Sequence, residues 1–223
     1  NEVVPKSLDS IRDITPIGKW MNGISSYSLW WIMCQYDYFM QNGRLDYLEE
    51  QREYLRGLVK ALCCLIDPDG SEKLADWRFL DWPTNADDAA KHCGLQGLLC
   101  LSLQASEYLF GVLGEESLAS LCRDKTALLK KHIPASTAKQ AAALLSLSGI
   151  GDAGKIDRDI ISRGGAHGYS TFYSYYILAA KALAGNTRGA LDDLREYYGA
   201  MLKLGATTFW EDFNLDWTVN ESG

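Results

Sequence analysis

Tryptophan and acidic side chains gather at several points of this 223-residue sequence where its apolar stretches are interrupted. Examples are Trp20, Asp81 next to Trp82, and Trp210 followed by Glu211. An indole face packs against the apolar C–H face of a pyranose ring, and a neighbouring carboxylate such as Asp81 accepts hydrogen bonds from sugar hydroxyls. The combination therefore predicts a carbohydrate-binding surface.

These aromatic and acidic residues differ in how easily core packing explains them. Trp30 and Trp31 are also consistent with filling the core. Trp82 precedes Pro83, which favours a loop and makes core packing a weaker explanation. Glu211 follows Trp210, where partial loss of solvent would raise the carboxyl pKa and favour deprotonation of a bound water. The alternative is an ordinary surface glutamate.

The elements that must position these residues are helices, because nearly every long segment has a 3.6-residue apolar period. Apolar helices are expected near residues 25–42, 87–111, 137–147 and 169–184, and the last of these should be mostly buried. Charged amphipathic helices are expected near 45–66, 115–132, 153–163 and 188–204. Gly43, Gly114, Gly149 and Gly185 suit helix C-terminal ends, and Ser136 or Asn186 suits an N-cap.

Short connections between alternately apolar and charged helices predict an all-α fold built of helical hairpins, with one ring inside another. This is the (α/α)6-barrel, or toroid, although an α-solenoid would look similar. The chain has about eight of the twelve helices that a closed toroid needs. We therefore expect residues 1–223 to form a single domain, either an incomplete toroid from a larger protein or a smaller bundle.

Net charge and hydropathy exclude two classes of partner. The formal charge of −7 repels phosphate backbones, so no nucleic acid is expected. No apolar run approaches the ~20 residues that span a bilayer, so no membrane partner is expected. The six cysteines lie mostly in helical patterns, which favours buried free thiols over one disulfide.

Three motifs match known sites only in part. Residues 149–154 fit G-x-G-x-x-G, but a helix rather than a strand precedes them, so a helix-turn-helix loop is expected. Residues 67–70 lack the ligand spacing of an EF-hand and predict a β-turn. A zinc or a Cys–His site could be formed by His92, Cys93, Cys63, Cys64 and His167, but no standard ligand spacing supports it. We expect no metal and no cofactor.

Several segments together resemble the inverting α-L-rhamnosidases of glycoside hydrolase family 78, over nearly the whole chain. The segments, in order, are WMNGISSYSLWW at 20–31, FLDWP at 79–83, GLQGLL at 94–99, STFYSYYIL at 170–178 and GATTFWEDF at 205–213. The resemblance implies that Glu211 is the general base and that Trp20, Trp82 and Trp210 line the rhamnose subsite. His167 either contacts that site or is structural.

The resemblance also implies what else the reaction needs. An inverting glycosidase requires a second carboxyl as general acid, which in this family lies upstream of the part that this sequence resembles. We therefore expect the base half of a site that acts on rhamnose-containing glycosides, little or no turnover by the isolated chain, and partnership with the remaining domains of the parent protein. Periplasmic or extracellular localisation is implied by resemblance alone.

Two alternatives to a hydrolase stay open. A non-catalytic sugar-binding or scaffold module would keep the helices and aromatic residues without a general acid. A zinc-dependent cyclase on the same architecture would need stoichiometric metal.

Overall fold

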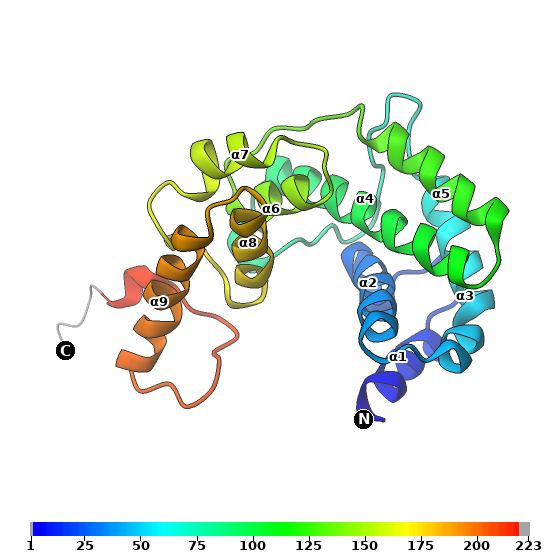
Figure 1. The fold of residues 1–223 in the computed structure, drawn as a ribbon, viewed down its shortest axis with the longest axis horizontal. Helices are drawn as coiled ribbons and strands as arrows, with labels where there is room; N and C mark the ends of the chain where they lie inside the picture. Colours follow the sequence, from blue (N-terminus) through cyan, green and yellow to red (C-terminus); the bar gives the residue numbers. More distant parts are fainter. Residues whose placement is uncertain (1, 219–223) are drawn as a thin grey trace. The chain divides into compact units, whose positions relative to one another are not determined.

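The computed structural model describes residues 2–218, and within them nine α-helices make up most of the chain (Figure 1). Extended segments are limited in this range to two isolated bridges, Ile24–Trp77 and Ile66–Glu72. The all-α fold class is therefore confirmed. The helices are α1 (Val3–Ile14), α2 (Ser25–Asn42), α3 (Leu45–Cys63), α4 (Asp88–Val112), α5 (Glu116–Leu129), α6 (Lys139–Leu147), α7 (Ala153–Ile156), α8 (Thr171–Leu183) and α9 (Thr187–Lys203).

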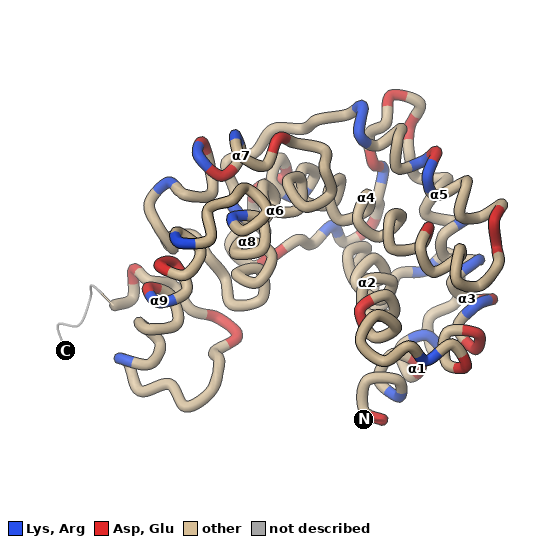
Figure 2. Tube along the Cα trace, viewed as in Figure 1, with Lys and Arg blue, Asp and Glu red and all other residues tan. Residues whose placement is uncertain are grey.

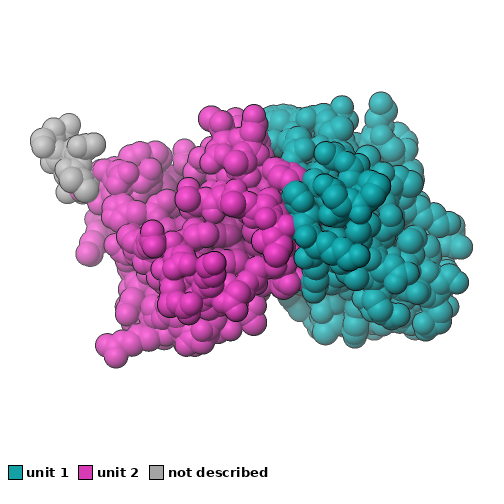
Figure 3. All heavy atoms as spheres, turned by 90° about the horizontal axis from the view of Figure 1, so that it is seen from above, with its two compact units in different colours: residues 1–79, 98–132 teal, residues 80–97, 133–223 magenta. Residues whose placement is uncertain are grey.

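The chain divides into two compact units, which Figure 3 colours separately. Unit 1 comprises residues 1–79 and 98–132, and unit 2 comprises residues 80–97 and 133–223. Each unit is described by itself below. The expectation of a single domain stays a prediction.

Helix ends follow the sequence signals closely. The four glycines expected at helix C-terminal ends, Gly43, Gly114, Gly149 and Gly185, all have positive φ. The Asn186 side chain caps α9 by accepting a hydrogen bond of 3.0 Å from the Gly189 amide. Ser136 binds the Ala138 amide instead, one residue before α6 begins, so its expected role as the N-cap is wrong.

The core of unit 1 is built on the apolar faces of α2 and α3. Leu29 and Ile32 of α2 are fully buried, as are Leu55 and Leu62 of α3. The charged residues of α3 lie off this stripe, and Figure 2 shows them along the helix. The amphipathic helix predicted here is confirmed.

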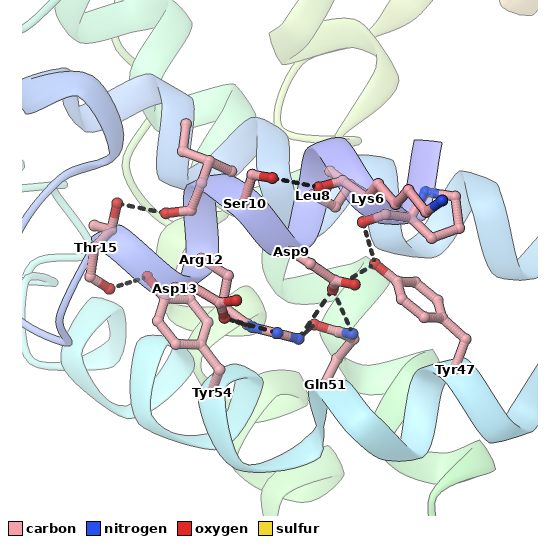
Figure 4. A network of polar contacts seen from close by, with 12 residues as sticks. Lys6, Leu8, Asp9, Ser10, Arg12, Asp13, Thr15, Tyr47, Gln51 and Tyr54 are labelled. Carbon is pink, nitrogen blue, oxygen red and sulfur yellow. Dashed lines mark hydrogen bonds and ion pairs between the residues drawn. The ribbon is translucent and has the colours of Figure 1, made fainter. Parts of the chain in front are cut away.

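Helix α1 was not expected from the sequence, and Pro5 is its only buried residue. Polar contacts hold it against α3 (Figure 4). Asp9 Oδ1 accepts hydrogen bonds from the Tyr47 hydroxyl at 3.1 Å and from Gln51 Nε2 at 3.0 Å. The Arg12 guanidinium lies 3.0 Å from the same oxygen. This helix is therefore positioned by hydrogen bonds more than by an apolar face.

The core of unit 2 centres on α6, which packs against α8, and α8 in turn packs against α9. Leu144 of α6 is fully buried. The expectation that the 169–184 helix is mostly buried is wrong in part, because Phe172, Tyr175 and Leu183 of α8 are exposed. Periodicity alone could not separate these positions, since aromatic residues occupy both faces of α8.

The two short motifs form turns, as predicted. Residues 149–154 join α6 to α7, where the Asp152 side chain accepts a hydrogen bond from the Lys155 amide. The Gly70 amide donates to the Asp67 carbonyl and closes a β-turn. The helix expected at 153–163 is α7 followed by a turn of π-helix, η3 (Asp157–Ile161). None of the helices in residues 2–218 is both long enough and apolar enough to span a bilayer.

Candidate functional site

The first part of the candidate site in unit 2 is a short turn that presents Trp82. This turn is the 3-10 helix η2 (Trp82–Thr84), which Pro83 favours because its φ is already fixed in the helical range. The Trp82 side chain is 58% exposed. Trp82 therefore lies on a surface turn, as expected from the sequence, and its indole is accessible.

Asp81 caps this turn with a buried carboxylate. Its Oδ1 accepts a hydrogen bond of 2.9 Å from the Trp82 amide, and its Oδ2 accepts one from the Ser170 hydroxyl. Burial raises the pKa of the Asp81 carboxyl, and the charge of Asp212 adds to the increase, while the hydrogen bonds from Ser170 and the Trp82 amide oppose it. Because both oxygens already have protein donors, Asp81 holds the Trp82 turn. Its expected hydrogen bonds to sugar hydroxyls stay a prediction.

The second part of the site is the segment that follows α9 and carries Trp210 and Glu211. Thr171 Oγ1 donates a hydrogen bond of 2.6 Å to the Trp210 carbonyl. The Tyr197 hydroxyl donates one of 2.9 Å to the Phe213 carbonyl, and burial, which raises the pKa of Tyr197 to about 12, keeps that hydroxyl protonated. The Trp210 and Phe213 rings also meet edge to face, with centroids 5.7 Å apart. The segment is thus held on both sides of Glu211.

Glu211 lies in the loop that the sequence predicted, but its side chain is exposed. The expected loss of solvent beside Trp210 is therefore wrong, although Trp210 itself is half-buried. Glu211 forms no hydrogen bond or ion pair with another residue in the range 2–218. The carboxylate is therefore open to water and to any molecule that binds at this surface.

His167 lies in a glycine-rich loop of unit 2. Its Nδ1 lies 3.1 Å from Asp216 Oδ1, and both side chains are largely exposed. A carboxylate only accepts hydrogen bonds, so Nδ1 carries the proton in this pair. The loop is held from inside the unit, where Lys139 Nζ donates to the Gly165 carbonyl and Gln140 Nε2 donates to the Gly168 carbonyl. His167 is therefore on an anchored loop and faces solvent.

Trp20 belongs to unit 1 and is described there alone. It is half-buried and precedes a 3-10 turn, η1 (Met21–Gly23). Trp31 is buried and donates its indole N–H to the Leu8 carbonyl, which confirms the core alternative for this residue. Trp30 is half-buried. Of the predicted site residues, the structure brings Asp81, Trp82, Trp210, Glu211 and His167 into one unit.

Metal-binding geometry is absent from the part of the chain that the structure describes, since no three His, Cys, Asp or Glu side chains there are grouped to hold an ion. All six cysteines are free thiols. Cys34 and Cys64 are exposed, so the expectation of burial holds for the other four.

A small cavity of about 170 Å³ lies in unit 1 and is lined by side chains of α2 and α4. None of the predicted site residues lines it.

Sequence reasoning assigned no role to Ser170, Thr171 and Tyr197, whose hydroxyls hold the site segments. A weak signal was present, because a serine or threonine at the start of a helix is typical of a cap. The sequence does not show which distant residue such a hydroxyl binds.

The fold is similar to that of two solved structures. One is the crystal structure of a GH78 family rhamnosidase of Bacillus sp. GL1, with a TM-score of 0.77 and 21% identity, covering 95% of this chain and 26% of that one. The other is a rhamnosidase from Klebsiella oxytoca with rhamnose bound, with a TM-score of 0.69 and 22% identity, covering 86% of this chain and 41% of that one. No protein-family model matches the sequence, nor does any curated protein.

The matched part of this chain therefore covers about a quarter of one rhamnosidase and about two fifths of the other. Identity at this level shows the fold and leaves function to be argued from the site. The chain shares its helical fold with a part of these rhamnosidases.

Proposed function

We propose that this chain is the part of an inverting glycoside hydrolase that binds a terminal α-L-rhamnosyl group and supplies the general base. In this proposal Glu211 deprotonates the water that attacks the anomeric carbon. Trp82 and Trp210 stack on the sugar. His167 contacts the sugar or its surroundings.

One observation carries the proposal. Two tryptophan-bearing segments that are far apart in sequence are tied to consecutive residues at the start of α8, Ser170 and Thr171. An accessible indole and an unpartnered carboxylate on such anchored segments are what sugar binding and proton transfer to water require. The likeness of the fold to two rhamnosidases supports the choice of sugar.

Inversion also needs a general acid about 6.5–9.5 Å from the base. We assign this role to no residue of the chain, and the proposal places the acid elsewhere in the parent protein. The chain alone should then fail to hydrolyse a natural rhamnoside, whose leaving oxygen must be protonated. It should still hydrolyse a rhamnoside with an activated leaving group, such as 2,4-dinitrophenol, because that group leaves without a proton.

The test uses both binding and turnover. L-Rhamnose should shift the indole N–H signal of Trp82 in NMR spectra of the chain, and Trp82→Ala should weaken binding. Trp77→Ala is the matched control, because Trp77 also follows an aspartate and is 51% exposed. Equal loss of binding in both variants would contradict the assignment of Trp82.

Turnover of the dinitrophenyl rhamnoside tests the base. Glu211→Gln should lower the rate by about 10²- to 10⁴-fold, the usual contribution of a general base. Asp212→Asn, a neighbouring exposed carboxyl, is the control and should retain the rate. Sugar binding together with a rate that Glu211→Gln leaves unchanged would favour the non-catalytic module.

A further inference from the structure

Ser170 stands at a helix start but does not cap the helix. It occupies the N-cap position of α8 with extended backbone angles, φ −127° and ψ 155°. A serine there usually accepts a hydrogen bond from an amide of the first turn, and replacing such a cap costs about 1 kcal/mol. In this structure the Ser170 hydroxyl makes no such bond and donates to the buried carboxylate of Asp81 instead. The hydroxyl is therefore used to hold another part of the chain.

Thr171, the next residue, holds a second segment. Its Oγ1 donates to the Trp210 carbonyl at 2.6 Å and lies 3.4 Å from the Tyr197 hydroxyl. The Tyr197 side chain is 1% exposed and donates to the Phe213 carbonyl, so these two hydroxyls fix the chain on either side of Glu211. The contacts span 39 and 16 residues of sequence.

The two anchors share one rigid base. Ser170 and Thr171 are joined by one peptide bond, and the Ser170 carbonyl already accepts the Ser174 amide within α8. Neither hydroxyl can move far without the other. The start of α8 therefore holds both the Trp82 turn and the Trp210–Glu211 segment.

We propose that Ser170 and Thr171 are positioning residues. They hold the Trp82 turn and the Trp210–Glu211 segment in the relative position that one bound sugar requires. The inference rests on the proposed function for the identity of the sugar. The positioning itself is a property of the free protein and can be measured without any ligand.

The first test is the backbone mobility of the free chain, measured as NMR order parameters of the amides. Thr171→Val keeps the shape of the side chain but removes the donor, and it should lower the order parameters of residues 209–213 while leaving those of α9 unchanged. Thr171→Ser retains a hydroxyl and should restore the wild-type order parameters. Thr187→Val is the matched control, because Thr187 is likewise the first residue of its helix and is exposed.

The second test is affinity for L-rhamnose, measured on the same variants. Loss of one hydrogen bond that pre-organises the site should weaken binding by about fivefold in Thr171→Val, with Thr171→Ser and Thr187→Val close to wild type. Unchanged order parameters at 209–213 in Thr171→Val would overturn the proposal, and so would a general decrease across α8 and α9. Lower order parameters at 209–213 with unchanged rhamnose affinity would also overturn it.

Ser170→Ala provides a separate route if Thr171→Val does not fold. It should speed hydrogen exchange at the Trp82 and Asn85 amides of the turn and leave the order parameters of residues 209–213 less affected. Exchange at the turn that matches wild type would overturn the role of Ser170. If the wild-type chain does not bind rhamnose, the proposed function fails, whereas the order parameters and the exchange rates of the turn still decide whether the two hydroxyls hold the two segments.

Discussion

In unit 1 the carboxylate of Asp9 joins two helices, whereas in unit 2 the carboxylate of Asp81 joins a surface turn to a helix. Asp9 binds Tyr47 and Gln51 of α3, and both of those side chains are buried. Asp81 binds the Trp82 amide and Ser170, and the Trp82 indole points to the surface with 58% of its area exposed.

The same side-chain chemistry thus has two results. Donors that converge on Asp9 add stability to helices that have already formed. Donors that converge on Asp81 fix a turn whose aromatic side chain is 58% exposed. The Asp81 network is therefore the one that holds the turn on which the proposed sugar site depends.

The largest effect should come from packing along α4, which contributes to both units. A β-carbon at Gly97, in unit 2, would lie 2.7 Å from the backbone carbonyl carbon of Leu144, whereas one at Gly111, in unit 1, would meet nothing within 4 Å. Gly97→Ala should lower the free energy of unfolding by about 3 kcal/mol, because the backbone of α6 must move. Gly111→Ala should raise it by up to about 1 kcal/mol.

Urea unfolding followed by circular dichroism measures both variants. If the two substitutions have the same sign and size, the close approach of α4 to α6 in unit 2 is wrong.

A smaller effect is expected from the Asp9 network of unit 1. Asp9→Ala removes the acceptor shared by Arg12, Tyr47 and Gln51, and should cost about 2 kcal/mol because buried donors lose their partner. Asp13→Ala is the control, since Asp13 pairs with Arg12 from a largely exposed position and should cost less than about 1 kcal/mol. Thermal and urea unfolding measure both. If Asp9→Ala also changed the affinity for L-rhamnose, the Asp9 network could not be described as one that only stabilises helices.

Much of the fold could be predicted because its signals are local. The apolar period of α3 and the glycine after α2, Gly43, depend only on residues a few positions apart. Helix α1 was missed although Val4, Leu8 and Ile11 have helical spacing, and the contacts that hold it to α3 lie about 40 residues away in sequence. The exposed face of α8 was missed because apolar residues occupy both faces of this helix, so their spacing does not show which face is covered.

The candidate site divides in the same way. The loop position of Trp82 and Glu211 could be predicted from neighbouring residues, such as Pro83. The burial of Asp81 could not, since its partner Ser170 lies 89 residues away and a sequence does not show that pairing. Solvent exposure of Glu211 likewise depends on what packs over the loop.

The smallest effect should be a pH dependence of the free energy of unfolding that arises from Asp81 in unit 2. Burial raises the pKa of Asp81 above its ordinary value of 3.8, so the folded chain holds this proton more tightly than the unfolded chain. The contribution of Asp81 to stability is therefore fully present below pH 3.8 and is lost as pH rises through the folded-state pKa. Asp81→Asn cannot titrate and should remove this decline, with a net change below about 1 kcal/mol at neutral pH, because the asparagine oxygen can still accept from the Trp82 amide.

Urea unfolding at a series of pH values from 3.5 to about 7 measures the decline. Asp81→Ala separates the effect of titration from that of hydrogen bonding. It should remove the same pH dependence, but it should also lower the free energy of unfolding at every pH by about 1–2 kcal/mol, because the Trp82 amide and Ser170 lose their acceptor. An unchanged slope in Asp81→Asn would mean that the Asp81 carboxylate is solvated like an exposed one. Asp81 and Asp9 would then differ only in where their networks lie, and Asp81 would not count as a buried carboxylate that holds the Trp82 turn.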